Sequence, residues 1–127
     1  MYYEITQGIE VEVRPEYLAA ESSPEACQFV FAYHITITNK GDTDVQLVSR
    51  HWIITDGLDL TEEVKGPGVV GKQPVLAPGE SFKYSSWCPL KTPTGMMRGT
   101  YQMIGAQGKQ FDIEIAPFAL KARYTVH

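Results

Sequence analysis

"FVFAYHITITNKG", residues 29–41, is the stretch that decides the fold of this chain. Its large apolar and aromatic side chains recur at every second position, at Phe29, Phe31, Tyr33, Ile35 and Ile37. Successive side chains of a β-strand point to opposite faces, so this period of two predicts a strand with one buried face. The abundance of aromatic and β-branched residues favours the same structure. The turn residues "NKGD" (39–42) then end the strand.

A similar alternation recurs along much of the chain and predicts further strands. The segments are "GIEVEVRPEYL" (8–18), "DVQLVSRHWIITDG" (44–57), "ESFKYSSWCPL" (80–90), "MRGTYQMIG" (97–105) and "KQFDIEIAPF" (109–118). We expect the strand of residues 29–38 to pair with the next one across "NKGD", as a hairpin or an adjacent pair. We expect the last two segments to form a hairpin around "AQG" (106–108).

No window shows the apolar stripe of a helix, and 11 glycines and 8 prolines separate short strands. A length of 127 residues suits one domain, here 1–127. We therefore predict a single all-β sandwich of about seven strands.

Composition excludes several classes of function. A net charge of −4 without a basic stripe argues against nucleic-acid binding. No apolar run is long enough for membrane insertion, and the first residues lack a signal-peptide pattern. We therefore expect a cytoplasmic location. Cys27 and Cys88 lack metal-ligand spacing, and we expect both to be reduced packing residues.

"KGPGVVGKQPVLAPGE", residues 65–80, contains the spacing G-x-G-x-x-G at Gly66, Gly68 and Gly71. Dinucleotide-binding folds use this spacing where a glycine turn opens a helix, whose N-terminus holds the phosphate. Here Pro74 and Pro78 follow the motif, and proline breaks a helix interior. We therefore interpret the glycines as a turn between strands.

An alternative stays open for the same loop. Successive backbone amides can form an anion-binding nest without a helix. Lys65 and Lys72 flank the loop and would add positive charge. This alternative makes the chain a sensor of pyrophosphate or a dinucleoside polyphosphate.

Three long segments carry a family resemblance: "VQLVSRHW" (45–52), "GVVGKQPVLAPGE" (68–80) and "TPTGMMRGTYQM" (92–103). With the regions between them, they resemble the bacterial ApaG family from about Gly8 to Phe118. The resemblance implies an immunoglobulin-like or fibronectin type III-like β-sandwich. It also implies an association with cobalt resistance and magnesium efflux, no assigned enzymatic activity, and use of similar domains as interaction modules. Pro67 departs from the family pattern, which has a charged or small residue at this position, and it removes one amide from the glycine loop.

The sequence offers no catalytic, metal or cofactor constellation. The histidines are His34, His51 and His127, and none lies in a motif that supplies a nucleophile, a base or a metal cage. In "SRHW", alternation places Arg50 and Trp52 on one face of a strand and His51 on the other. Either Trp52 or His51 fills the core while Arg50 pairs with an acidic neighbour, or Arg50 and His51 belong to a polar patch that receives a ligand.

"SSWCPLKTPTGMMRG", residues 85–99, is a candidate contact loop, since its large side chains Trp87, Met96, Met97 and Arg98 are of types common at interfaces. The alternative is that these residues cap the end of the core. The segment "APFALKARYTVH" (116–127) is apolar enough to dock on a sheet or on a second copy, which makes a homodimer a candidate assembly. We predict a non-enzymatic binding or regulatory module that acts on a protein partner the sequence does not identify.

Overall fold

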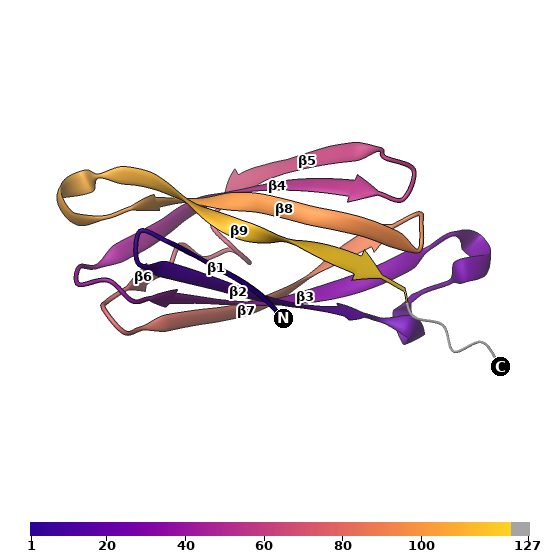
Figure 1. Cartoon of the computed structure of the whole chain (residues 1–127), viewed down its shortest axis with the longest axis horizontal. Helices are drawn as coiled ribbons and strands as arrows, with labels where there is room; N and C mark the ends of the chain where they lie inside the picture. The colour runs from indigo at the N-terminus through magenta and orange to yellow at the C-terminus, as the bar shows by residue number, and fades with distance from the viewer. Residues whose placement is uncertain (123–127) are drawn as a thin grey trace.

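A computed structural model describes residues 1–122 of the chain. These residues form nine β-strands and three short 3₁₀ turns, η1 (Ala19–Glu21), η2 (Pro24–Ala26) and η3 (Ala106–Gly108). The strands make two antiparallel sheets that lie face to face, which confirms the predicted all-β sandwich (Figure 1).

The first sheet has the strand order β1 (Tyr2–Thr6), β2 (Ile9–Tyr17), β3 (Phe29–Asn39) and β7 (Ser81–Leu90). Its register places apolar residues opposite one another, as in the pairs Val11 with Ile37 and Ile37 with Phe82. The five alternating apolar residues of β3 are all buried, as their period predicted.

The second sheet has the order β5 (Thr61–Pro67), β4 (Val45–Asp56), β8 (Thr94–Ile104) and β9 (Gln110–Lys121). The two-residue strand β6 (Val75–Leu76) pairs with the start of β4. β8 and β9 form the expected C-terminal hairpin around η3. Strands β1, β5 and β6 lie outside the segments predicted from alternation. β5 is mostly exposed and β6 has two residues, so neither carries a clear apolar period.

The core lies between the sheets and is centred on aromatic rings. Trp52 meets Tyr33, Tyr101 and Phe118, with ring centroids 5.3, 6.3 and 5.9 Å away in edge-to-face arrangements. Each such pair contributes about 0.5 to 1.5 kcal/mol beyond the burial of its area. Trp52 therefore ties β4 to strands of both sheets.

The predicted pairing of β3 with β4 is wrong. β3 pairs with β2 and β7, whereas β4 belongs to the second sheet. The connection crosses between the sheets and is held by Asn39, whose buried Nδ2 donates to the carbonyls of Thr43 and Leu76 at 2.8 and 2.9 Å. Because these partners come from the crossing loop and from β6, the turn sequence alone does not reveal them.

The two long sides of the sandwich differ. On one side, β1 and β9 close the gap, with Glu114 N donating to Thr6 Oγ1 at 3.1 Å (Figure 1). On the other side, the edge strands β5 and β7 are not hydrogen-bonded to each other. There the glycine-rich connection between β5 and β6 lies across the opening.

The two cysteines differ from the expectation that both are packing residues. Cys88 is buried on β7, whereas Cys27 is exposed beside η2, where φ is +54°. Both thiols are free. In residues 1–122, no helix has the length and apolar character needed to cross a bilayer.

Candidate functional site

Arg50 and Trp52 both face the interior of the sandwich because of a bulge in β4. Leu47 pairs with Met103 of β8, but Ser49 pairs with Gln102, so Val48 is an extra residue. A single extra residue reverses which face the later side chains occupy. Trp52 is consequently 2% exposed. Of the two residues expected as candidates to fill the core, Trp52 and His51, it is Trp52 that does so.

His51 lies on the outer face of the second sheet. Its Nε2 is 3.0 Å from Glu63 Oε1 on the neighbouring strand. His51 and Arg50 therefore lie on opposite faces of β4 and do not form one polar patch.

Arg50 does not pair with an acidic neighbour. Its Nη1 donates to the carbonyl oxygens of Pro67 and Gly68, at 3.0 and 2.8 Å. Within residues 1–122, Arg50 forms no ion pair, and its Nε and Nη2 make no hydrogen bond. The carbonyls of the glycine-rich loop thus hold one nitrogen of the guanidinium and leave two other donor nitrogens unused.

The positions of the three glycines are explained by the contact of Arg50 with the loop and by the turn within the loop. The guanidinium of Arg50 lies 3.1 to 3.2 Å from where a Cβ on Gly66 would sit. Gly68 has φ of +62°, and a Cβ there would approach Lys72 O to 2.4 Å. Gly71 has φ of +78° in open space. Gly68 and Gly71 therefore have a backbone reason in the turn, the interpretation preferred from the sequence, whereas Gly66 at the end of β5 makes room for the Arg50 side chain.

Several amides of the loop already donate hydrogen bonds, to β4 or within the loop's own turn. Gly68 N donates to Val48 O, and Val69 N and Lys72 N donate to each other's carbonyls. Lys65 and Lys72 are exposed, and neither lines the space beneath the loop. The pyrophosphate nest stays a prediction, but it cannot draw on these three amides without breaking the turn.

Beneath the loop lies a cleft of about 370 Å³, which we call the Arg50 cleft. It opens on the unpaired side of the sandwich, between the two sheets. Its walls come from β3, β4, β7 and the loop: Tyr33, Arg50, Trp52, Pro67, Val69, Val70, Gly71, Tyr84 and Ser86.

The phenols at and below this cleft are neutral. Tyr84 OH is hydrogen-bonded to Tyr101 OH. Burial raises the pKa of both phenols above the ordinary value, and the charge of Arg50 lowers each only in part. Burial also raises the pKa of Tyr33, partly offset by a hydrogen bond with Ser86. Around neutral pH these groups therefore act as hydroxyl donors and acceptors.

A second candidate site is centred on Trp87, on the outer face of the first sheet. Trp87 is 71% exposed because β7 points Phe82, Tyr84 and Cys88 inward. Beside it runs a groove of about 770 Å³, which we call the Trp87 groove. It is lined by β2, η1, β3 and β7 through Glu16, Tyr17, Leu18, Ala19, Ala20, Glu21, Val30, Trp87 and Pro89.

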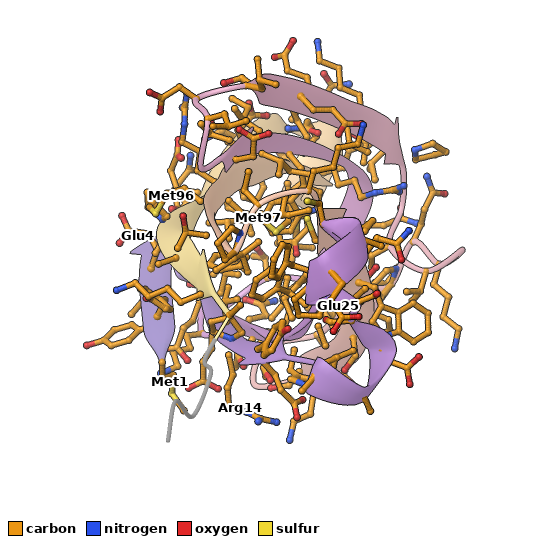
Figure 2. All side chains as sticks on the ribbon, turned by 90° about the vertical axis from the view of Figure 1, so that its right-hand side faces the viewer. Met1, Glu4, Arg14, Glu25, Met96 and Met97 are labelled. Carbon is orange, nitrogen blue, oxygen red and sulfur yellow. The ribbon has the colours of Figure 1, made fainter. Side chains whose placement is uncertain are left out.

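The candidate contact loop of residues 85–99 is not one surface. β7 and β8 lie in different sheets, so Trp87 is separated from the exposed Met96 and Arg98. Met97 is buried in the core and does not lie on a contact surface. Its burial agrees with the alternative that residues of this segment pack on the core. Figure 2 shows Met96 near the periphery and Met97 among the central side chains.

The remaining sequence candidates do not converge. His34 lies on the outer face of the first sheet, bonded to Glu16 and Ser85 at 2.9 and 2.6 Å. Across the described part of the chain, no three His, Cys, Asp or Glu residues are grouped to hold a metal. Residues 116–121 continue β9, in which residues 118–121 pair with β8, and His127 lies outside the described residues.

Sequence reasoning missed the partners of both sites. It did not include η1 in the Trp87 groove, or Tyr33 and Tyr84 in the Arg50 cleft. One signal was present for the cleft: Leu47 and Trp52 are five residues apart, an odd spacing that only a bulge can place on one face.

The fold is that of an immunoglobulin-like, fibronectin type III-like β-sandwich, with the Arg50 cleft between its sheets and the Trp87 groove outside them. A family model described as the ApaG domain matches residues 19–105. The chain belongs to the ApaG family.

Known proteins resemble the chain over almost its full length. It is 54% identical over 120 residues to Protein ApaG of Rhodospirillum centenum, covering 94% of this chain and 92% of that protein. It is 53% identical to Protein ApaG of Bordetella pertussis, covering 92% and 89%. A crystal structure of a Bordetella pertussis protein named ApaA shares 50% identity, covers 97% of both chains and superposes with a TM-score of 0.89.

Proposed function

We propose that this chain is a non-enzymatic binding module that recognises a segment of a protein partner in the Trp87 groove. The observation that carries the proposal is the exposure of Trp87 on a rigid strand beside an apolar groove. Tryptophan is enriched among the residues that contribute most to protein interfaces.

The groove supplies a preformed apolar floor. Trp87 is fixed opposite Ala32 in the β3–β7 ladder, and Val30 is fixed opposite Pro89. η1 forms the far wall, and Leu18 N holds it to the sheet by donating to Val30 O at 2.9 Å. A rigid site reduces the entropy that is lost on binding.

The charge of the groove selects the partner. Glu16 and Glu21 line it, and no lysine, arginine or histidine is among its lining residues. An attracted segment should therefore combine basic residues with apolar or aromatic anchors, since complementary charge sets specificity and association rate.

The biological setting of this proposal is taken from what the resemblance to the ApaG family implies. We place the module in the cytoplasm, where binding to a protein partner would give it an accessory role in cobalt resistance and magnesium efflux. A domain that binds without catalysing a reaction fits this role.

Selection from a library of displayed random peptides tests the proposal. The wild-type protein should enrich basic sequences with aromatic or aliphatic anchors. The variants Trp87→Ala and Glu21→Lys should each weaken binding of these peptides by about tenfold or more. Met96→Ala, an exposed apolar residue on the other sheet, is the matched control.

Two results would contradict the proposal. Selected peptides that bind the Trp87→Ala protein as tightly as the wild type would remove the groove as the site. Peptides that lose binding on Met96→Ala instead would move the interface to the outer face of the second sheet.

A further inference from the structure

We propose that the Arg50 cleft binds a small organic monoanion, a carboxylate carried on an aromatic or branched apolar body. This site lies between the sheets and is separate from the Trp87 groove, so it goes beyond the partner-binding function.

The first argument is the unbalanced charge of Arg50. The guanidinium is always protonated, and it faces the cleft without a carboxylate partner in residues 1–122. No acidic side chain lines the cleft. Nη1 is held by Pro67 O and Gly68 O, which fixes the plane of the group. Nε and Nη2 stay available, and a carboxylate accepts hydrogen bonds from such a pair in parallel.

The second argument is a donor beside the same space that has no acceptor. The hydroxyls of Tyr84 and Ser86 at the cleft wall are already paired, with Tyr101 and Tyr33. The buried Nε1 of Trp52 has no hydrogen-bond partner in the described structure. A buried polar group without a partner costs about 1 to 3 kcal/mol. Groups that accept hydrogen bonds are therefore the missing component of this site.

The third argument concerns the rest of the ligand. The rings of Tyr33 and Tyr84 and the aliphatic Val69 and Val70 line the cleft beside the charge. A volume of about 370 Å³ is at the small end of ligand pockets. The cleft thus suits one ring or one branched chain next to the anionic group.

A polyphosphate fits less well than a monoanion. Arg50 is the one cationic side chain among the lining residues, and Lys65 and Lys72 are not among them. A single guanidinium cannot neutralise the several charges of pyrophosphate, whereas it balances one carboxylate.

The chain has only two tryptophans, which gives the experiment an internal reference. The ¹⁵N-labelled protein is titrated with phenylacetate, and the indole N–H signals of Trp52 and Trp87 are followed by NMR. Phenylacetate should shift the Trp52 signal saturably and leave the Trp87 signal in place. Phenylacetamide, which has nearly the same shape without charge, should bind at least about tenfold more weakly.

Two variants with a control test the location. Arg50→Gln should abolish the saturable shift, but it also releases the loop. Val70→Glu is the safer variant, because Val70 is 54% exposed at the cleft and a carboxylate there would repel the ligand. It should weaken binding by about tenfold. Val75→Glu, 58% exposed and away from the cleft, should leave binding unchanged.

Two outcomes would overturn the proposal. The first is a Trp52 signal that never shifts with phenylacetate. The second is equal binding of phenylacetamide, which would make the site merely apolar.

Discussion

The two tryptophans of this chain lie in strands of similar pattern but in opposite environments. Trp52 is 2% exposed at the centre of the core, and Trp87 is 71% exposed on the outside of the first sheet. Alternation decides which residues share a face, but not which face is buried. In β7 the inward face holds Phe82, Tyr84 and Cys88, and Trp87 belongs to the other set.

The difference separates a residue that stabilises the fold from one that we propose to act in recognition. Trp52 contacts aromatic rings of both sheets, so its burial holds the sandwich together. Trp87 lies beside a groove, and little of its surface is used for folding. Substitutions at the two tryptophans, and then at neighbouring positions, test this separation.

The largest expected effect is at Trp52. Trp52→Ala leaves a cavity in the core and should lower the free energy of unfolding by about 3 to 5 kcal/mol. Trp87→Ala should change it by less than about 0.5 kcal/mol, since exposed sites contribute little to stability. Urea unfolding monitored by circular dichroism measures both. Comparable losses in the two variants would break the comparison, because Trp87 would then be a structural residue.

The next largest effect is a pH dependence of stability caused by Cys88. Cys88 follows Trp87 on β7 and points inward, so it tests the contrast between the two faces of this strand. Burial raises the pKa of the Cys88 thiol from 9.0 to about 11. Because the folded pKa exceeds the unfolded one, the stabilisation is complete below about pH 9 and is lost as pH rises towards 11. The expected loss is on the order of 2 to 3 kcal/mol.

Urea unfolding between about pH 8 and pH 11 measures this loss, because this range covers both the unfolded and the folded pKa of the thiol. Cys88→Ala should flatten the pH dependence between pH 8 and about pH 10, above which the buried tyrosines add a loss of their own. Cys27→Ser alters the exposed thiol and serves as the matched control, which should keep the wild-type slope. A Cys27→Ser protein with a flattened slope would show that the effect does not come from the buried face.

The smallest effect concerns the loop at the boundary between interior and surface. Gly68→Ala should cost about 2 kcal/mol or more, because it adds a clash with Lys72 O to an unfavourable positive φ. Gly71→Ala should cost about 1 kcal/mol, because its φ is also positive but its surroundings are open. Chemical denaturation ranks the two variants. An equal cost would mean that only the backbone angle matters and that the packing of the loop does not.

Much of the fold could be predicted from short-range pattern. The buried sets of β2 and β3 and the C-terminal hairpin follow from a period of two and local turns. The pairing of β3 with β4 could not be predicted, because the carbonyls that hold Asn39 include Leu76 O, far along the chain. The exposure of Cys27 likewise depends on how the β2–β3 connection lies on the sheet.

The candidate sites were predicted in part. The sequence pointed to Arg50, the glycine loop and Trp87, but it assigned Arg50 an acidic partner that the structure replaces with two carbonyls. It also joined Trp87 to Met96 and Arg98, which the sandwich places on different sheets. Neighbours in sequence separate here because β7 and β8 cross from one sheet to the other.

The sequence by itself determined that this chain is an all-β sandwich, since alternation and turn residues act over a few positions. It also determined that the glycine motif does not open a helix, because of Pro74 and Pro78. The tertiary structure alone decided that the loop receives Arg50 and that a groove forms beside Trp87. The first depends on the extra residue in β4, and the second on the pairing of β3 with β7. The energies that fix such contacts come from segments that meet only in the folded chain.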